Sequence, residues 1–294
     1  MTVALAIREA AEVLASVSDT PRLDAELLMA YVLGVTRPEM LLRAMREPVP
    51  PGIAALVVRR LRHEPVAYIV GAQEFYGLEL IVTADVLIPR GDSETLIEAA
   101  RTGLAERPPT RVLDLGTGSG ALLLAALALW PGAHGVGVDR SLAAVAVAAA
   151  NAGRLGMAGR ARILHDDWNR PGWADALGRF DLILANPPYV EDHAALAHEV
   201  RGHEPAGALF AGAEGLDAYR TLIPQLGALL EPGGLAIVEI GATQSDAVAR
   251  LAIEAGFDTE LHRDLAGRPR ALVHKKALGK PDDRHYSETK PAGG

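Results

Sequence analysis

The spacing of hydrophobic and polar residues changes near residue 75. Before that point, apolar residues recur at helical spacing in three stretches: 3–17, 23–33 and 53–61. The next eight residues, 75–82, have the apolar and aromatic character of a strand or hairpin, and a further helix is predicted from Asp92 or Ser93 to Ala100. The pattern therefore predicts a small N-terminal helical domain at residues 1–75 and a hairpin or linker at residues 76–90.

From residue 111 onward, short apolar runs alternate with helical segments. Strands are predicted at 112–115, 135–138, 161–164, 180–185 and 235–240, and helices at 120–129, 142–152 and 244–255. This alternation is typical of an α/β domain with a parallel, doubly wound sheet, here at residues 91–277. Ligands of such sheets bind beyond the carboxyl ends of the strands, so the chemistry is expected directly after each strand. Residues 278–294 are polar with Pro and Gly and are expected to be disordered.

Composition narrows the classes of protein that the pattern allows. The absence of Cys excludes disulfides, zinc–thiolate sites and a thiol nucleophile. The first fifteen residues are predicted to form an amphipathic helix instead of a signal peptide, and the apolar windows are about half the ~20 residues of a membrane span. A net charge of −8 argues against direct nucleic-acid binding. We expect a cytoplasmic protein without membrane contact.

A glycine-rich loop follows the first predicted strand of the α/β domain. Its residues Gly116, Thr117, Gly118, Ser119 and Gly120 form G-x-G-x-G before an Ala/Leu helix. Glycines let a backbone turn tightly and approach a nucleotide closely. The spacing differs from the G-x-G-x-x-G of dinucleotide folds, and the Lys-Ser/Thr pair of a phosphate loop is absent. An ordinary glycine-rich turn is the alternative interpretation.

Carboxylates follow the next two predicted strands. Asp139 lies 19 residues after Gly120, close to the spacing of an acid that accepts from ribose hydroxyls. It is alternatively a helix-capping residue. The following strand ends at Asp166 and Asp167, which suit an adenine amino group, and at Trp168, which suits the adenine ring; the alternative is a surface turn. Three such features at successive strand ends favour a nucleoside-containing cofactor.

The tetrapeptide Asn186-Pro187-Pro188-Tyr189 directly follows the predicted strand 181–185. Two consecutive prolines fix an extended backbone, so Asn186 Oδ1 and the Pro187 carbonyl can accept both hydrogens of one NH₂ group. Tyr189 can stack on the planar group that carries it. Two such acceptors direct the nitrogen lone pair at a sulfonium methyl and stabilise the charge that develops. The alternative is an Asn-Pro turn that closes a strand.

Several further segments resemble one family, the release factor glutamine methyltransferases, over residues 1 to about 276. They are Glu64-Pro65-Val66-Ala67-Tyr68-Ile69-Val70-Gly71, Glu74-Phe75-Tyr76-Gly77-Leu78, Val86-Leu87-Ile88-Pro89-Arg90 with Ser93-Glu94, His203-Glu204-Pro205, Gly215-Leu216-Asp217, Glu239-Ile240-Gly241 and Asp264-Leu265-Ala266-Gly267-Arg268. One departure is Gly91, where the family usually has Pro; Gly loosens this turn.

The resemblance implies a Rossmann-like class I methyltransferase domain and a known reaction. S-adenosyl-L-methionine would methylate the side-chain amide nitrogen of the Gln in the Gly-Gly-Gln motif of class 1 peptide-chain release factors. By motif, residues Gly116 to Gly120, Asp139 and Trp168 would hold the cofactor. Asn186 would bind cofactor and substrate, and Pro187, Pro188 and Tyr189 would shape the Gln pocket. The N-terminal helices would help to bind the release factor.

Three alternative functions are compatible with parts of this sequence pattern. A sister enzyme methylates a Gln of a ribosomal protein, a DNA adenine methyltransferase acts on another planar NH₂, and a non-catalytic scaffold would only bind the cofactor. Phe75-Tyr76-Gly77 and Gly267-Arg268 favour the release factor enzyme, and no extra domain for duplex recognition is visible. We predict no metal site, because His193, His198 and His203 are five residues apart, whereas ligands on one helix face are three or four apart.

Overall fold

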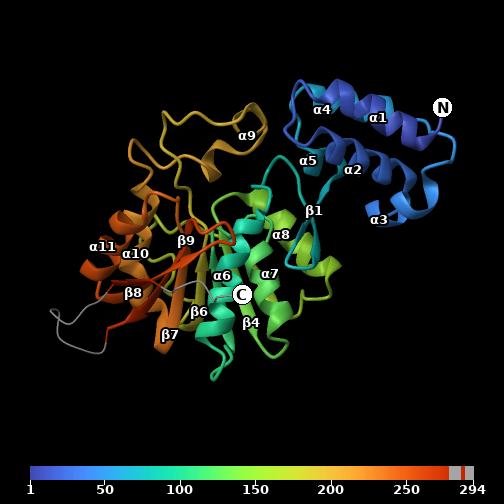
Figure 1. Ribbon diagram of the computed structural model, residues 1–294. Helices are drawn as coiled ribbons and strands as arrows, with labels where there is room; N and C mark the ends of the chain where they lie inside the picture. Colours follow the sequence, from blue (N-terminus) through green and yellow to red (C-terminus); the bar gives the residue numbers. More distant parts are fainter. Residues whose placement is uncertain (278–285, 289–294) are drawn as a thin grey trace. The chain divides into compact units, whose positions relative to one another are not determined.

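A computed structural model describes residues 1–277 and 286–288 (Figure 1). The chain forms two compact units. The first consists of Met1–Ala72 and Leu196–Glu204, and the second of Gln73–Ala195 and Pro205–Gly294. The second segment of the first unit is a departure from the expected organisation, because residues 196–204 lie inside the stretch assigned to the α/β domain. Among the described residues, no helix has both the length and the apolar character to cross a membrane.

The first unit is helical, as its hydrophobic pattern predicted. Its elements are α1 (Val3–Leu14), α2 (Pro21–Leu33), α3 (Arg37–Glu39), the π-helical turn η1 (Met40–Ala44), α4 (Ile53–Leu61), α5 (Val66–Val70) and α9 (His198–His203). The Thr2 side chain accepts a hydrogen bond from the Leu5 N–H and begins α1. Val3, Ile7 and Leu14 are fully or almost fully buried at helical spacing and pack with Met29 of α2 in one apolar core.

A buried arginine attaches α9 to the other helices of the first unit. Arg60 of α4 is only 4% exposed, and its Nε donates to Asp24 Oδ2 at 2.7 Å. Its Nη2 lies 2.8 Å from Glu199 Oε2. His203 Nε2 lies 3.2 Å from the Arg62 carbonyl oxygen. Since a buried guanidinium needs anionic partners, Glu199 is a structural part of this unit.

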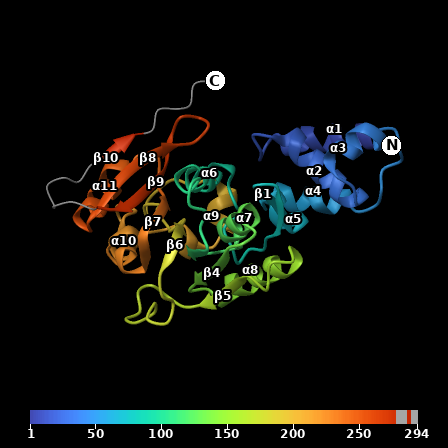
Figure 2. The same cartoon turned by 90° about the horizontal axis from the view of Figure 1, so that it is seen from below.

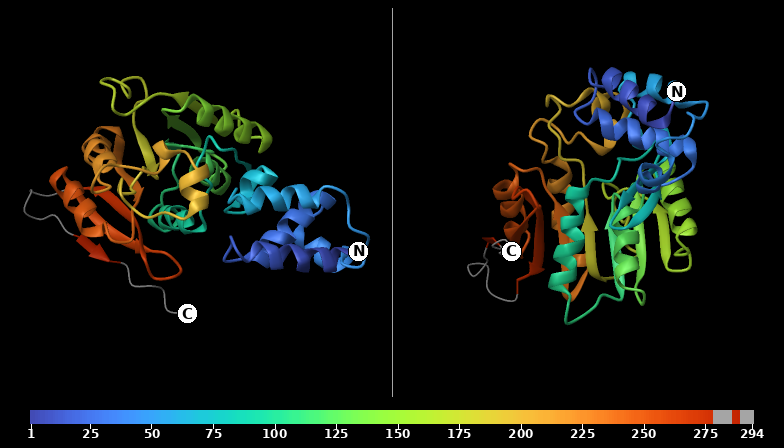
Figure 3. Two further views of the ribbon diagram at one scale, coloured as in Figure 1. Left: turned by 90° about the horizontal axis from the view of Figure 1, so that it is seen from above. Right: turned by 45° about the vertical axis from the view of Figure 1, so that its right-hand side comes forward.

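The second unit contains a twisted eight-stranded sheet (Figures 2 and 3). Its strands are β3 (Arg111–Leu115), β4 (His134–Asp139), β5 (Ala161–His165), β6 (Phe180–Ala185), β7 (Leu230–Glu239), β8 (Phe257–Arg263), β9 (Pro269–Lys276) and β10 (Tyr286–Glu288), in the order β10-β8-β9-β7-β6-β3-β4-β5. Strands β3 to β7 pair in parallel. Their carboxyl ends therefore meet at one edge, which confirms the predicted α/β fold.

The C-terminal part of the sheet differs from the predicted parallel pattern. Strand β9 is antiparallel to both β7 and β8. Strand β10 lies in the segment that we expected to be disordered, and it pairs in parallel with β8. That expectation is wrong for Tyr286–Glu288, while residues 278–285 and 289–294 lie outside the described part of the chain.

Helices cover both faces of the sheet. They are η2 (Gly91–Ser93), α6 (Glu94–Gly103), α7 (Ala121–Leu129), α8 (Leu142–Arg154), η3 (Ala206–Ala208), α10 (Asp217–Leu229) and α11 (Ser245–Glu254). Leu182 and Leu184 of β6 face a core shared with α6 and α7. Ile183 and Ala185 face the core shared with α10 and α11. Because side chains alternate along a strand, both faces of β6 are apolar and buried.

A short hairpin precedes the sheet, with strands β1 (Ala72–Phe75) and β2 (Leu78–Ile81). It begins earlier than the hairpin or linker predicted from residue 76. Tyr76 and Gly77 form its two-residue turn with φ of 51° and 77°, as tight hairpins require. The Asn151 amide of α8 pairs with both the N–H and the carbonyl of Ile81 at 2.7 and 2.9 Å. The hairpin is therefore fixed to a helix of the same unit.

Candidate active site

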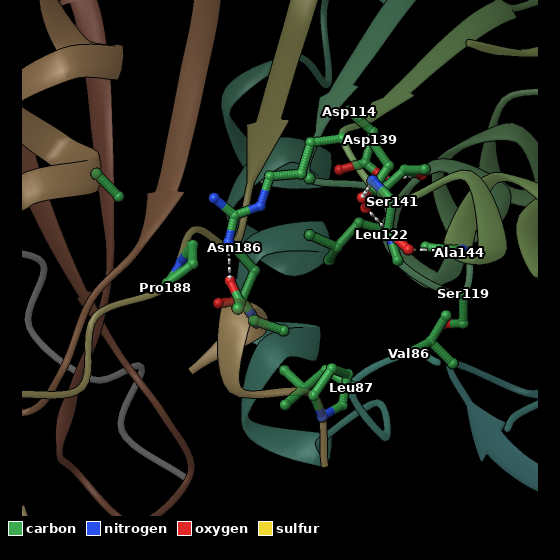
Figure 4. A pocket seen from close by; sticks show the side chains of 18 of the residues that line it. Val86, Leu87, Asp114, Ser119, Leu122, Asp139, Ser141, Ala144, Asn186 and Pro188 are labelled. Carbon is green, nitrogen blue, oxygen red and sulfur yellow. Dashed lines mark hydrogen bonds between the residues drawn. The ribbon is translucent and has the colours of Figure 1, made fainter. Parts of the chain in front are cut away.

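A cavity of about 410 Å³ lies at the carboxyl ends of β3 to β6, entirely within the second unit (Figure 4). Figure 4 shows Asn186 and Pro188 on one side of it and Asp139 and Ser141 on another. The sequence-predicted residues that line it are Gly116, Thr117, Gly118, Ser119, Asp139, Trp168, Asn186 and Pro188. Gly120, Pro187 and Tyr189 are not among its lining residues. The cavity thus brings together the loops that follow four different strands.

The glycine-rich loop has a backbone that requires glycine. Gly116, Gly118 and Gly120 have φ of 74°, 54° and 84°, in the left-handed region that other residues rarely adopt. A Cβ at Gly116 would lie 3.3 Å from the Trp168 ring, and one at Gly120 would lie 3.1 Å from Leu124. Trp168 therefore packs directly over the loop at the edge of the cavity. A side chain at Gly116 would push the Trp168 ring away from the loop.

Asp139 closes the loop from the neighbouring strand. Its Oδ2 accepts from the Gly118 N–H at 2.9 Å, and its Oδ1 accepts from the Ser141 N–H at 2.8 Å. The capping role is filled by Ser141, whose hydroxyl accepts from the Ala144 N–H. Because an ionised carboxylate has about four acceptor sites, both oxygens of Asp139 retain capacity toward the cavity. The carboxylate is thus held in place and still able to bind a ligand.

Asp114 is a second carboxylate in the cavity wall, at 1% exposure. Its Oδ2 accepts from the Thr117 hydroxyl at 2.7 Å and from the Leu123 N–H at 3.3 Å. Burial raises the pKa of Asp114 to about 7, although these hydrogen bonds oppose the rise. A positively charged group bound nearby would favour its ionised form.

The Asn-Pro-Pro-Tyr segment is held by contacts on both sides. The Tyr189 carbonyl accepts from Gln244 Nε2 at 3.0 Å, and the Val190 N–H donates to the Leu209 carbonyl at 2.8 Å. The Tyr189 hydroxyl donates to Glu239 Oε1 at 3.2 Å. Burial, followed by the charge of Glu239, raises the pKa of Tyr189, so its hydroxyl stays protonated near neutral pH. Tyr189 is thus anchored at its backbone and at its hydroxyl.

The chain matches known proteins over most of its length. A family model described as PrmC N-terminal domain matches residues 6–71, and one described as Methyltransferase small domain matches residues 93–203. A release factor glutamine methyltransferase from Rhodospirillum rubrum is 42% identical over 280 residues, which is 93% of this chain and 85% of that protein. One from Cereibacter sphaeroides is 44% identical, over 92% of this chain and 98% of that protein.

The chain belongs to the release factor glutamine methyltransferase family. The predicted resemblance is therefore confirmed, and the protein is an enzyme, a methyltransferase.

Solved structures bear on the fold of this family member. A methyltransferase from Pyrococcus furiosus covers 75% of this chain and 98% of its own, with a TM-score of 0.50 and 17% identity. The hMettl16 catalytic domain covers 81% of this chain and 83% of its own, with a TM-score of 0.55 and 13% identity. At these identities the comparison concerns the fold alone, and it supports the Rossmann-like class I methyltransferase domain.

Four residues of this family member's site were not predicted from its sequence. Ser93 and Glu239 stood in segments that carried the family resemblance, but they were given no role in the site. Asp114 and Gln244 were given none either. Ser93 Oγ accepts from Asn186 Nδ2 at 3.4 Å and donates to Glu239 Oε2 at 2.5 Å. Asp114 lies in the predicted strand directly before the glycine-rich loop, and this position is the local signal that could have identified it. The other contacts join segments far apart in sequence.

Two remaining predictions concern Gly91 and metals. Gly91 begins η2, its φ lies outside the left-handed region, and a Cβ there would meet no atom within 4 Å. The turn therefore does not require glycine on steric grounds. Within residues 1–277 and 286–288, no group of three His, Cys, Asp or Glu side chains is placed to hold a metal ion.

Proposed function

We propose that this enzyme methylates the side-chain amide nitrogen of the Gln in the Gly-Gly-Gln motif of class 1 peptide-chain release factors. The observation that carries the proposal is the position of Asn186 and Pro188 in the wall of the same cavity as Gly118 and Asp139. An amide-binding role for the first pair and a nucleoside-binding role for the second would bring substrate and cofactor together in this cavity. The names of its relatives support a release factor as the protein substrate.

S-adenosyl-L-methionine is the proposed cofactor. A cavity of about 410 Å³ is within the range of small-molecule sites. The glycine loop allows a close approach, since Gly116 and Gly118 line the cavity without side chains. Asp139 offers acceptors for ribose hydroxyls, and Asp114 offers a carboxylate for an ammonium group. The donors and acceptors of this wall therefore fit the cofactor.

The bound cofactor would supply an electrophilic methyl group on a sulfonium. The chain's own residues would orient the nitrogen that accepts it. Asn186 Oδ1 and the Pro187 carbonyl would each accept one hydrogen of the Gln amide, and Tyr189 would stack on the amide plane. These acceptors stabilise the positive charge that develops on nitrogen, an effect largest in the transition state. The methylated amide cation loses a proton readily, so a strong base is not required.

The first unit, with helices α1 to α5 and α9, is the proposed contributor to release factor binding. The second unit contains every residue of the proposed methyl-transfer site, so the first is free for recognition. The net charge of −8 does not favour nucleic acid as the partner. Because release factors act in the cytoplasm, we propose a cytoplasmic location for the enzyme.

Mass spectrometry of a purified release factor, incubated with the enzyme and S-adenosylmethionine, tests the proposal. We expect a mass gain of one methyl group on the Gly-Gly-Gln peptide. Asn186→Ala should lower turnover by about 10²–10³, because one preorganised contact to the developing charge is lost. A ribosomal-protein substrate is offered in parallel. Methylation of that protein alone, or wild-type turnover by Asn186→Ala, would contradict the assignment.

A further inference from the structure

A buried chain of hydrogen bonds runs from Asn186 into the protein interior. Asn186 Nδ2 donates to Ser93 Oγ at 3.4 Å, and Ser93 Oγ donates to Glu239 Oε2 at 2.5 Å. Ser93 is 4% exposed and Glu239 1%. Ser93 comes from η2, Asn186 follows β6 and Glu239 ends β7, so three separate elements of the second unit meet here.

The direction of these bonds follows from the carboxylate. Burial raises the pKa of Glu239, while its hydrogen bonds from Ser93 and Tyr189 and the charge of Arg270 oppose the rise. In its ionised form Glu239 can only accept, so the Ser93 hydroxyl proton points toward it. The Ser93 oxygen then presents lone pairs toward Asn186 and can accept only from its NH₂ group. Arg270 supplies the compensating positive charge, with Nη1 3.9 Å from Glu239 Oε1. This arrangement selects one of the two orientations of the Asn186 amide.

The two amide orientations differ in chemistry. With Nδ2 held by Ser93, Oδ1 is the atom left to accept a hydrogen from a substrate NH₂ group. After a half-turn, the Asn186 NH₂ would face the substrate NH₂, and two donors would meet without an acceptor. An Asn side chain has no intrinsic preference between these states, because its O and N ends are nearly equal in shape. The selection must come from its neighbours.

Glu239 also serves the other end of the tetrapeptide. Its Oε1 accepts from the Tyr189 hydroxyl at 3.2 Å, while its Oε2 accepts from Ser93. The backbone of Glu239 is fixed independently, because the Tyr219 hydroxyl donates to its carbonyl at 2.9 Å. One rigid carboxylate therefore orients two of the four residues in Asn-Pro-Pro-Tyr.

We propose that Ser93 and Glu239 are positioning residues, which hold the Asn186 amide with its oxygen toward the methyl-accepting nitrogen. The proposal rests on the proposed amide methylation. Ser93 acts through Asn186, and Glu239 acts through Ser93 and Tyr189.

A double-mutant cycle tests the dependence on Asn186. Ser93→Ala should lower kcat about tenfold to a hundredfold and leave the calorimetric Kd for S-adenosylmethionine within about twofold. In the Asn186→Ala background, the same change should lower kcat less than about twofold, because the group it orients is gone. Ser93→Thr keeps the hydroxyl and should retain most of kcat. Equal losses in both backgrounds, or a Ser93→Thr as slow as Ser93→Ala, would overturn the proposal.

Two further variants separate orientation from general damage. In Glu239→Gln, the new amide can donate to Ser93 Oγ, which frees the Ser93 proton to point at Asn186 and favours the unproductive orientation. We expect a kcat loss at least as large as that of Ser93→Ala. Thr259→Val removes a buried hydroxyl of the same unit, which pairs with His274 and does not line the cavity, and it should keep near-wild-type kcat. A Thr259→Val as slow as Ser93→Ala would show that the effect is not specific, which overturns the proposal.

A measurement without substrate keeps this inference separate from the proposed function. The side-chain NH₂ resonances of Asn186, identified by their absence in Asn186→Ala, report whether that group is held. We expect slower hydrogen exchange of these protons in the wild type than in Ser93→Ala or Glu239→Gln. Equal exchange in all three would refute the positioning role even in a fully active enzyme. Slow wild-type exchange without release factor methylation would leave the positioning supported and the substrate assignment wrong.

Discussion

Removal of the Asp139 carboxylate is the most direct test of the cofactor site. Gly118 and Ser141 hold its two oxygens through N–H donors at 2.9 and 2.8 Å, so the carboxylate is already in place before a ligand binds. Hydrogen bonds to a charged group contribute about 1.5–3 kcal/mol each. Loss of two such bonds to ribose hydroxyls in Asp139→Ala should therefore cost about 3–6 kcal/mol. This corresponds to a rise of about 10²- to 10⁴-fold in Kd.

Calorimetry with two ligands isolates the ribose contribution. Asp139→Ala also leaves the Gly118 N–H without its acceptor, so part of its effect could come from the loop. S-adenosylhomocysteine and its analogue without both ribose hydroxyls should therefore be titrated into wild type and variant. The analogue should bind the wild type about as weakly as the normal ligand binds the variant, and the variant should hardly distinguish the two. An unchanged Kd in Asp139→Ala, or equal discrimination by both proteins, would refute the assignment.

Two predictions concern pH. The pKa of Asp114 is raised to about 7, so about half of the Asp114 carboxyls carry a proton at pH 7. Pairing with the cofactor's ammonium group should therefore release about half a proton per site. Calorimetry in buffers of different ionisation enthalpy measures this release, and Asp114→Asn should show none. Burial lowers the pKa of His274 to about 3, so its stabilising effect is complete above its unfolded pKa of 6.5 and is lost as pH falls toward 3. The reference is the double variant Thr259→Val/His274→Leu, which lacks the titrating group. Between pH 6.5 and 5, the free energy of unfolding from urea denaturation should fall by about 2 kcal/mol more in the wild type than in this variant. An equal pH dependence of the two proteins would contradict the prediction.

The parallel half of the fold could be predicted because its signals are local. Each run from β3 to β6 is short, apolar and followed by a turn or a helix. Strand β8 carries a local signal as well, since Phe257, Thr259 and Leu261 alternate as buried positions. Its neighbour β9 runs antiparallel to β7. This direction depends on the pairing of distant strands and cannot be derived from the residues of β9 alone. Helix α10 contains Pro224, which local rules count against a helix.

The same division holds for the site. Gly116, Asp139 and Asn186 could be identified because each directly follows a predicted strand, and parallel strands bring such positions to one edge. The contacts of Ser93 with Glu239 join residues 146 positions apart, so no local pattern could reveal them. The attachment of Glu199 to Arg60 is equally non-local. Motifs in the sequence thus identified residues that line the cavity. The residues that hold them in place, such as Ser93 and Glu239, could be identified only from the tertiary structure.

The split composition of the first unit has a consequence for biosynthesis. The apolar cluster that joins its first helices consists of residues between Val3 and Leu61, so it can collapse soon after this stretch leaves the ribosome. Arg60, however, meets Glu199 only after β3 to β6 have been synthesised. Until then, the guanidinium of Arg60 has Asp24 as its carboxylate partner and lacks its second one. Completion of this early-folding unit is therefore timed by translation of the segment that follows Asn-Pro-Pro-Tyr.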